Sequence, residues 1–143
     1  MEIHIVENEK NLRVVIECRQ VDEQVTRLKS HIELFDNKIQ AKKENEYYLI
    51  EALEVLYFES VDNRVFAYTE NQVLEIKQRL YELEDILSGK DFIRISKSQI
   101  VNVNKVRTLK PEINRTILVT MCNGEMLYVS RSYVKQFRNL LSI

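Results

Sequence analysis

The sequence predicts a mostly β domain of the α+β class, with short α-helices and a strand–helix extension at its N-terminus. Apolar and polar residues alternate in several short runs between residues 38 and 129, which is the period of half-buried strands. Asp62-Asn63 and Asn123-Gly124 separate such runs with dipeptides that favour tight hairpin turns. The chain has 143 residues, 45% of them hydrophobic and 30% charged, as expected for one soluble globular domain with or without an appendage.

The N-terminal extension, residues 1–37, is predicted to contain two strands and one helix. Glu2–Val6 and Leu12–Glu17 alternate as strands do. Apolar residues spaced by four and three predict a helix over Asp22–Phe35, with Asp22 as its N-cap. This stripe either packs on the chain's own strands or makes the extension a dimerisation or sensing element. Its residues are Val21, Val25, Leu28, Ile32 and Phe35.

Residues 38–143 are predicted to form the main domain, built from hairpins and two helices. Apolar residues spaced by four and three predict a helix over Lys77–Ser88 that stops at Gly89. A final helix of one or two turns follows from the apolar pattern of 133–141. The predicted strands are Lys38–Lys42, Glu46–Ile50, Val55–Val61, Arg64–Thr69, Val73–Ile76, Arg107–Leu109, Thr116–Met121 and Glu125–Val129.

The run Phe92–Val103 has apolar flanks around the polar centre Arg94-Ile95-Ser96-Lys97-Ser98. Apolar flanks can anchor in a core and hold the polar side chains of the centre outward. Guanidinium, ammonium and hydroxyl donors held in this way suit the recognition of an anion. Phosphate and a guanine edge are both candidates.

Charge is unevenly distributed, although the net charge is only −1 at pH 7. Residues 46–89 carry three basic and ten acidic side chains, whereas residues 90–143 carry ten basic and three acidic ones. A basic C-terminal third is the electrostatic feature expected of a protein with a polyanionic partner. The alternative is that the acidic middle segment neutralises the basic third within one fold.

Several chemical classes lack the motifs that they require. The sequence contains no glycine-rich phosphate loop, nucleophile elbow or paired-cysteine metal spacing, so we predict no enzymatic activity, no metal and no cofactor. Two cysteines are too few for a disulfide framework, which favours a reducing compartment. The N-terminus does not have the pattern of a signal peptide, and no apolar run reaches the length of a membrane span. We therefore expect a cytoplasmic protein without direct membrane insertion.

Three segments, in their order and spacing, resemble the LytTR family of bacterial DNA-binding domains. The first is V-L-Y-F-E-S-V-D-N-R-V-F-A-Y at Val55–Tyr68. The second joins R-L-Y-E-L-E-D-I-L to D-F-I-R-I-S-K-S-Q-I-V-N-V over Arg79–Val103, and the third is N-G-E-M-L-Y-V-S-R-S-Y-V-K-Q-F at Asn123–Phe137. The resemblance covers about Lys38–Leu141. With its short leader, the chain resembles the stand-alone regulators of this family, which have no receiver domain.

The resemblance implies small β-sheets packed together with short helices, and DNA binding through loops at strand ends that enter successive major grooves. It implies base contacts by Asn63 and Arg64, by Lys97 and by Arg131, whose side chains can pair with adenine or guanine edges. At Ser96 the sequence departs from the family, in which many members have His. The candidate phosphate contacts, most of them basic side chains of the C-terminal third, are Arg94, Ser96, Ser98, Lys105, Arg107, Ser132, Lys135 and Arg138.

Each of these contacts has a structural alternative. Asn63 can serve the backbone geometry of its turn, and Lys97 can be a solvated surface lysine. Arg131 can cap the hairpin or pair with Glu125. Arg94 can lie along a strand and pair with the acidic middle segment.

The expected function is that of a sequence-specific transcriptional regulator that binds double-stranded DNA. The resemblance implies paired repeat sites, so a homodimer is expected, and it suggests a membrane protein as a regulatory partner. The alternative is a protein-interaction antagonist that forms mixed dimers with a related regulator without itself reading DNA. The acidic segment 46–89 motivates this alternative, because exposed carboxylates repel a duplex.

Overall fold

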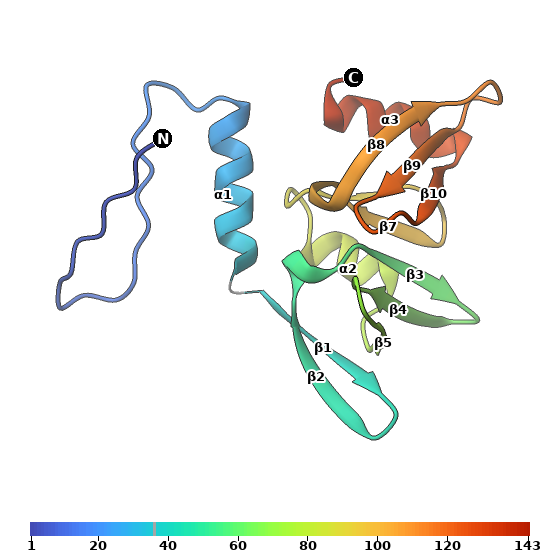
Figure 1. The fold of residues 1–143 in the computed structure, drawn as a ribbon, viewed down its shortest axis with the longest axis horizontal. Coiled ribbons are helices and arrows are strands. Elements are labelled where there is room, and N and C mark those ends of the chain that lie inside the picture. The colour runs from blue at the N-terminus through green and yellow to red at the C-terminus, as the bar shows by residue number, and fades with distance from the viewer. Residues whose placement is uncertain (36) are drawn as a thin grey trace.

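The structure is a computed structural model that describes residues 1–35 and 37–143. Within these residues, ten β-strands form two antiparallel sheets (Figure 1). The predicted fold class, mostly β with short α-helices and small packed sheets, is confirmed. None of the described helices is long and apolar enough to cross a membrane. The α-helices are α1 (Glu23–Phe35), α2 (Leu80–Ile86) and α3 (Arg131–Leu141), and the 3₁₀ helices are η1 (Ala52–Glu54) and η2 (Val103–Lys105).

The larger sheet has seven strands, and every neighbouring pair is antiparallel. The predicted turn at Asp62-Asn63 joins two of its central strands. Both residues have positive φ, 51° and 62°, as a two-residue turn between paired Val61 and Arg64 requires. In the order β2-β1-β5-β4-β3-β7-β6, the strands are Glu46–Glu51, Lys38–Lys43, Val73–Ile76, Arg64–Tyr68, Tyr57–Val61, Gln99–Asn102 and Phe92–Arg94.

The smaller sheet has three strands in the order β10-β9-β8, and α3 packs on it through the fully buried Phe137. The predicted hairpin turns at Asn123-Gly124. Gly124 has a φ of +91°, and Asn123 Oδ1 accepts a hydrogen bond from Glu125 N at 3.1 Å. These local bonds fix the turn that the sequence predicts. The strands are β8 (Val106–Pro111), β9 (Ile117–Met121) and β10 (Met126–Val129).

Two hydrophobic clusters lie on opposite faces of strand β3. Neighbouring side chains of a strand point to opposite faces, so Phe58 belongs to one cluster and Tyr57 to the other. Phe58 shares its cluster with Leu83 of α2. Tyr57 stacks on Tyr68, with ring centroids 4.3 Å apart, and shares its cluster with the smaller sheet and α3. The larger sheet is therefore covered by α1 and α2 on one face and by the smaller sheet and α3 on the other.

Helix α1 begins at its predicted cap and touches the domain with one side only. Val25 N donates to Asp22 Oδ1 at 3.0 Å, which satisfies a free N–H group of the first turn. On the side that meets the domain, Leu34 is fully buried and Ser30 Oγ donates to Gly89 O at 3.0 Å. These contacts hold α1 beside η1 and the turn that follows α2.

The predicted apolar stripe of α1 is only partly covered. Val21 and Phe35, at its two ends, are 76% and 62% exposed. Val25, Leu28 and Ile32, between them, are half-buried. Packing on the domain therefore leaves much of the stripe facing solvent.

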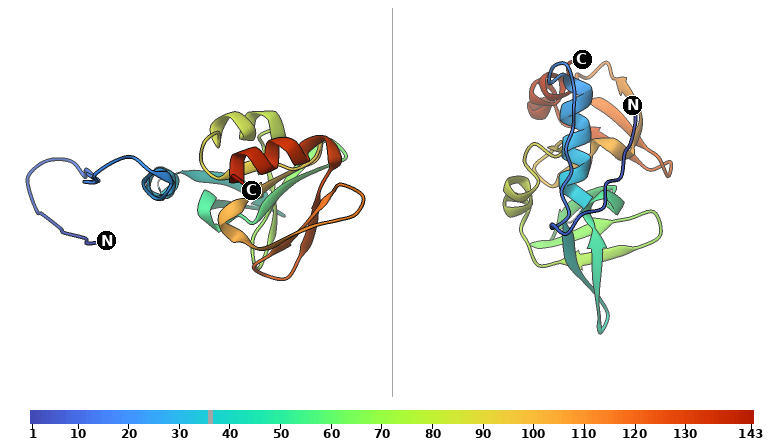
Figure 2. Two further views of the ribbon diagram at one scale, coloured as in Figure 1. Left: turned by 90° about the horizontal axis from the view of Figure 1, so that it is seen from above. Right: turned by 90° about the vertical axis from the view of Figure 1, so that its left-hand side faces the viewer.

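The prediction of strands at Glu2–Val6 and Leu12–Glu17 is wrong for the single chain, in which residues 1–22 form neither strand nor helix. Figure 2 shows this segment standing away from the domain on the far side of α1. The alternation of residues is compatible with a strand, but no strand of the described chain lies beside it. A strand needs hydrogen-bond partners, and two strands alone are marginal in water.

Helix α2 is shorter than predicted, spanning Leu80–Ile86 rather than Lys77–Ser88. Ile76 also fits the helical spacing, but it is the last residue of β5, as the predicted strand Val73–Ile76 has it. There it lies opposite Ala41 on one neighbouring strand and Val65 on the other. Pairing within the sheet therefore overrides the helical spacing at this position.

Candidate nucleic-acid interface

The first candidate contact is the β3–β4 turn, which carries Asn63 and Arg64 at the end of a hairpin (Figure 1). The backbone of Asn63 has the positive φ that the turn needs, and its carbonyl oxygen accepts a hydrogen bond from Arg79 Nη1 at 3.0 Å. The side chain of Asn63 is exposed and forms no hydrogen bond within the described residues. Its amide is thus free for an external partner, while its backbone serves the turn.

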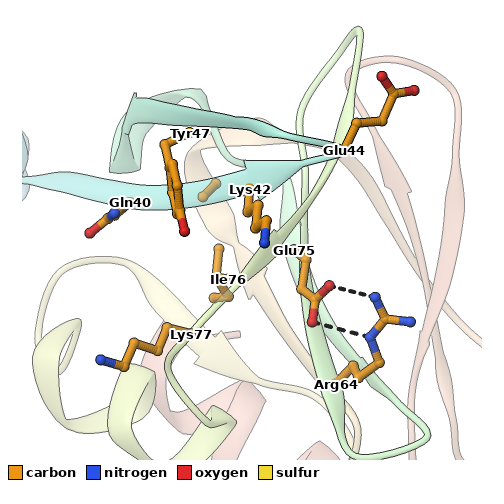
Figure 3. Close-up of a pocket in the computed structure, with 9 residues that line it drawn as sticks. Gln40, Lys42, Glu44, Tyr47, Arg64, Glu75, Ile76 and Lys77 are labelled. Atoms are coloured by element: carbon orange, nitrogen blue, oxygen red, sulfur yellow. Dashed lines mark hydrogen bonds and ion pairs between the residues drawn. The ribbon is translucent and has the colours of Figure 1, made fainter.

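Arg64 lies next to this turn and faces Glu75 across the sheet (Figure 3). Its Nε and Nη2 atoms donate to Glu75 Oε1 and Oε2 at 3.1 and 2.5 Å. The hydrogen bonds from Arg64 lower the pKa of the Glu75 carboxyl below its ordinary value. The Arg64 side chain is nevertheless 61% exposed, so solvent screens this ion pair.

The sheet brings Lys42 to the same place, a contribution that the sequence did not reveal. Lys42 lies directly opposite Glu75 in the β1–β5 pairing, and its Nζ is 5.6 Å from the ring centroid of Tyr47. Together with Lys77 and Arg64, these residues line an open depression (Figure 3). The pairing of β1 with β5 joins segments about 30 residues apart, so no local sequence signal could have placed Lys42 beside Arg64.

The second candidate contact is the loop between β6 and β7, which carries Ser96, Lys97 and Ser98. Lys97 is exposed and forms no ion pair within the described residues. Ser96 and Ser98 are half-buried, and Ser98 N donates to Ser96 Oγ at 3.2 Å. The loop thus presents one ammonium group without an ion pair in the described chain, and the hydroxyl oxygens of the serines on either side of it lie 3.4 Å apart.

Arg94 holds this loop through hydrogen bonds to its backbone. Its Nε donates to Ser96 O at 2.8 Å and its Nη2 to Lys97 O, while its Nη1 pairs with Glu84 Oε2 of α2 at 2.8 Å. The side chain is only 17% exposed. Arg94 therefore pairs with the acidic middle segment, as the structural alternative stated, and its donors are occupied by the protein.

The third candidate contact is Arg131, the first residue of α3. Its side chain is exposed and forms no ion pair with Glu125 or any other residue in the described chain. The first turn of α3 contains no acidic residue, so the free N–H groups of the helix start have no carboxylate nearby in sequence. Such a helix start, next to a guanidinium group, favours an anion.

Backbone hydrogen bonds connect these three contacts. Ser60 N, near the β3–β4 turn, donates to Ser98 O at 2.8 Å. Ser130 N, directly before Arg131, donates to Ile95 O at 2.9 Å. The β6–β7 loop is therefore fixed between the β3–β4 hairpin and the start of α3. We call this row of Asn63-Arg64, Lys97 and Arg131 the three-contact rim. The β3–β4 hairpin and α3, which carry two of its contacts, lie beyond α1 from residues 1–22 (Figure 1).

Helix α3 extends the basic character of the rim. Arg131, Lys135 and Arg138 are exposed and spaced by four and three residues, so they share one face of the helix. Ser132 is also exposed beside them. The buried Phe137 holds the opposite face on the smaller sheet.

Lys105 and Arg107 are less closely tied to the rim. Lys105 ends η2 and is half-buried, and Arg107 is exposed on the edge strand β8. Among the described residues, neither side chain forms a hydrogen bond or ion pair with the residues of the rim. Their assignment as phosphate contacts stays a prediction.

Many carboxylates of the acidic middle segment are already engaged. Glu75 pairs with Arg64, and Glu84 pairs with Arg94. Glu59 accepts hydrogen bonds from Tyr68 Oη at 3.1 Å and from Gln99 Nε2 at 2.6 Å. Of these three carboxylates, only Glu84 pairs with a cation of the basic C-terminal third, because Arg64 belongs to the acidic segment itself and the partners of Glu59 are neutral.

Comparison with known proteins identifies this architecture. Residues 45–142 match the family model described as the LytTr DNA-binding domain. The chain belongs to the LytTR family of DNA-binding domains. The three-contact rim is therefore part of a LytTR domain. The family and its relatives assign the chain to the DNA-binding transcriptional regulators.

Relatives and a solved LytTR structure agree with this assignment. A protein of Staphylococcus aureus (strain NCTC 8325 / PS 47), named an uncharacterized HTH-type transcriptional regulator, is 39% identical over 100 residues. The match covers 70% of this chain and 67% of that protein; a protein of the same description in strain MRSA252 is 38% identical with the same coverage. The solved LytTr domain of a Bacillus cereus protein, described as a methyl-accepting/DNA response regulator, superimposes with a TM-score of 0.73. It shares 32% identity and covers 76% of this chain and 99% of its own.

The description "HTH-type" belongs to those relatives and does not describe the helices of this LytTR protein. A helix-turn-helix joins two helices by a short turn. Over residues 1–35 and 37–143, strands separate α1 from α2 and α2 from α3.

Proposed function

We propose that this LytTR protein is a sequence-specific transcriptional regulator that reads double-stranded DNA with its three-contact rim. The observation that carries the proposal is the pair of backbone bonds from Ser60 and Ser130 to the β6–β7 loop. Because these bonds fix three donor-bearing segments in one row, the segments can address one face of a duplex together. The B-DNA major groove is wide enough to admit protein elements of this size.

The chemistry of the rim supports a division of roles. Asn63 can make a bidentate contact with adenine, and the guanidinium groups of Arg64 and Arg131 match the edge of guanine. Lys97 can donate to guanine or to phosphate. Ser96, Ser98 and the basic face of α3 can hold phosphates, which fixes the register without specifying sequence.

Paired recognition sites and a homodimer are the second part of the proposal. A single rim addresses a short stretch of duplex, so two copies on neighbouring repeats give higher affinity and specificity by acting together. The half-exposed stripe of α1 supports self-association, because it leaves apolar surface uncovered in the single chain.

Selection of bound duplexes from a random pool tests this function directly. We expect recovery of a defined motif in two repeats, and affinity for that duplex that falls steeply as salt rises, because phosphate neutralisation releases counterions. A non-selected duplex of equal length is the matched control for the sequence-independent part of the affinity. Recovery of random sequence from the pool would contradict the proposal.

The antagonist is the competing outcome of the same experiment. A chain that binds a related regulator but shows no sequence preference and no salt dependence toward duplexes would fit it. The acidic segment 46–89 supports the antagonist only weakly. Its carboxylates Glu59, Glu75 and Glu84 are bonded to partners within the fold, so fewer of them are free to repel a duplex.

A further inference from the structure

The N-terminal arm, residues 1–22, exposes most of its apolar side chains, and Ile16 is the half-buried exception. Ile3, Ile5 and Leu12 are 84%, 88% and 90% exposed. In the described chain, no backbone hydrogen bond joins residues 1–21 to another segment. Apolar side chains together with unpaired backbone groups are the properties of a strand that lacks its neighbour.

The second half of the arm has a sharply two-sided pattern. If residues 12–18 are extended, alternate side chains lie on opposite faces. One face then carries Leu12, Val14, Ile16 and Cys18, which are all apolar. The other face carries a basic residue, a valine and an acidic residue at equal spacing, namely Arg13, Val15 and Glu17.

We propose that residues 12–18 pair with the same residues of a second copy as antiparallel strands, about a two-fold axis at Val15. In this register Arg13 lies opposite Glu17 of the second copy, and Val15 lies opposite its own equivalent. On the other face, Val14 lies opposite Ile16 and Leu12 opposite Cys18. The strand is thus complementary to itself in both charge and hydrophobicity, as a two-fold interface requires.

Other registers lose this complementarity. A shift of one residue places Arg13 opposite Ile16 of the second copy and mixes the two faces. A shift of two residues keeps the apolar face but sets Arg13 or Glu17 opposite Val15. Only the register with its two-fold axis at Val15 therefore places both Arg13 and Glu17 opposite a residue of opposite charge.

The charge of the arm favours a second copy over a polyanionic surface. Residues 1–22 contain five acidic and three basic side chains, so anionic lipid and DNA both repel the arm as a whole. The remaining apolar surface fits the same assembly. Glu2–Val6 can add an outer strand on each side, and the half-exposed stripe of α1 can cover the apolar face, as a small sheet requires.

This inference deepens the homodimer of the proposed function, but it is tested without DNA. In the full chain with Cys18→Ser and Cys122→Ser, Val15→Cys places two thiols opposite each other across the axis. Mild oxidation should link most of the Val15→Cys protein into covalent dimers, because directly opposed strand positions are within disulfide reach.

Neighbouring positions provide matched controls. Val14→Cys alone and Ile16→Cys alone should stay largely monomeric on a denaturing gel. An equimolar mixture of the two should cross-link, because these positions oppose each other in the proposed register. Equal cross-linking of all three single variants, or none by Val15→Cys, would overturn the register.

Charge reversal tests the same interface without cysteines. Arg13→Glu or Glu17→Arg alone should weaken the dimer about tenfold in sedimentation equilibrium, because each creates two like-charge pairs. The double reversal should restore it, and Lys10→Glu, outside the paired residues, should have little effect. Failure of the double reversal to restore the dimer would contradict the pairing. If the chain selects a DNA motif but stays monomeric, the proposed interface is wrong and the DNA-reading function stands. If the chain forms dimers but has no affinity for DNA, the DNA-reading function is wrong and the interface stands.

Discussion

Arg64 and Arg94 are both held by glutamates, but their surroundings give them different roles. Arg64 is 61% exposed and, among the described residues, donates hydrogen bonds only to the Glu75 carboxylate, whereas Arg94 is 17% exposed and also donates to two loop carbonyls. An exposed ion pair has little net stability, so Arg64 can exchange Glu75 for a base or a phosphate. Arg94 would have to release its loop in order to do the same.

Glu75→Gln should therefore raise the affinity for the selected duplex several-fold. The change removes a carboxylate that competes with DNA for the Arg64 guanidinium. Fluorescence anisotropy titrations would measure it, with Glu54→Gln, which removes the same charge from an exposed site in η1, as the control. A drop in affinity for Glu75→Gln would mean that the pair pre-orients Arg64.

The pH dependence of that pair has a definite sign. The hydrogen bonds from Arg64 lower the pKa of the Glu75 carboxyl. The ion pair is therefore fully formed at pH values above the ordinary pKa of a glutamate, and it is lost as the pH falls through the lowered pKa. Duplex affinity should thus show no titration from Glu75 around neutral pH. A rise in wild-type affinity on acidification from neutral pH that Glu75→Gln abolishes would contradict this assignment.

Asn102 has a structural role at the end of β7. It is fully buried, its Nδ2 donates to Val55 O at 2.8 Å, and its Oδ1 accepts from Asn104 N at 3.0 Å. Asn102→Ala should lower the free energy of unfolding by about 1–3 kcal/mol, because it leaves buried groups unpaired. Urea denaturation would measure the loss, and Asn71→Ala is a contrasting variant at an exposed position whose side chain forms no hydrogen bond within the described residues. Wild-type stability of Asn102→Ala would contradict this role.

At the scale of elements, the β6–β7 loop depends on contacts from every side. Ser60 and Ser130 hold its ends through backbone bonds, and Arg94 holds its centre from the side of α2. The loop is thus a rigid part of the domain whose geometry is set by three other elements. Lys97 gains a fixed position from this support, which reduces the entropy lost on binding.

The variant Arg94→Ala shows whether Arg94 supports the β6–β7 loop or contacts a phosphate. We expect the affinity for the selected duplex to fall about tenfold or more while the slope of affinity against salt stays unchanged, because no phosphate charge is lost. Arg94→Lys should not restore affinity, since one ammonium group cannot reach Glu84 and two carbonyls together. A slope reduced by about one would instead identify Arg94 as a phosphate contact.

At the scale of the whole molecule, local patterns predicted the parts that local chemistry determines. The turns at Asp62-Asn63 and Asn123-Gly124 and the C-terminal helix follow from residues close together in the chain. The pairing of β1 with β5, which brings Lys42 to Arg64, depends on contacts about 30 residues apart. Such long-range pairings leave no signal in a single sequence. The uneven charge suggested that Arg94 pairs with the acidic middle segment, but it did not identify Glu84 as the partner.

The arm illustrates the opposite case. The alternation of Glu2–Val6 and Leu12–Glu17 predicts strands, yet the single chain provides no sheet edge for them. The pattern is explained if the missing strand belongs to another copy. The molecule then has two separate surfaces, the rim for DNA on the domain and the arm for self-association, which stands away from the domain beyond α1 (Figure 2).

The central claim is that the three-contact rim reads bases, and Arg131 and Lys135 test it most directly. Both are exposed cations on α3, four residues apart. Affinities of Arg131→Ala and Lys135→Ala should be measured for the selected duplex and for a panel with one base pair changed at a time. Arg131→Ala should cost about 1–3 kcal/mol on the selected duplex and relax the preference at one position, whereas Lys135→Ala should weaken all duplexes alike. Equal, sequence-independent losses from both variants would contradict base reading by the rim.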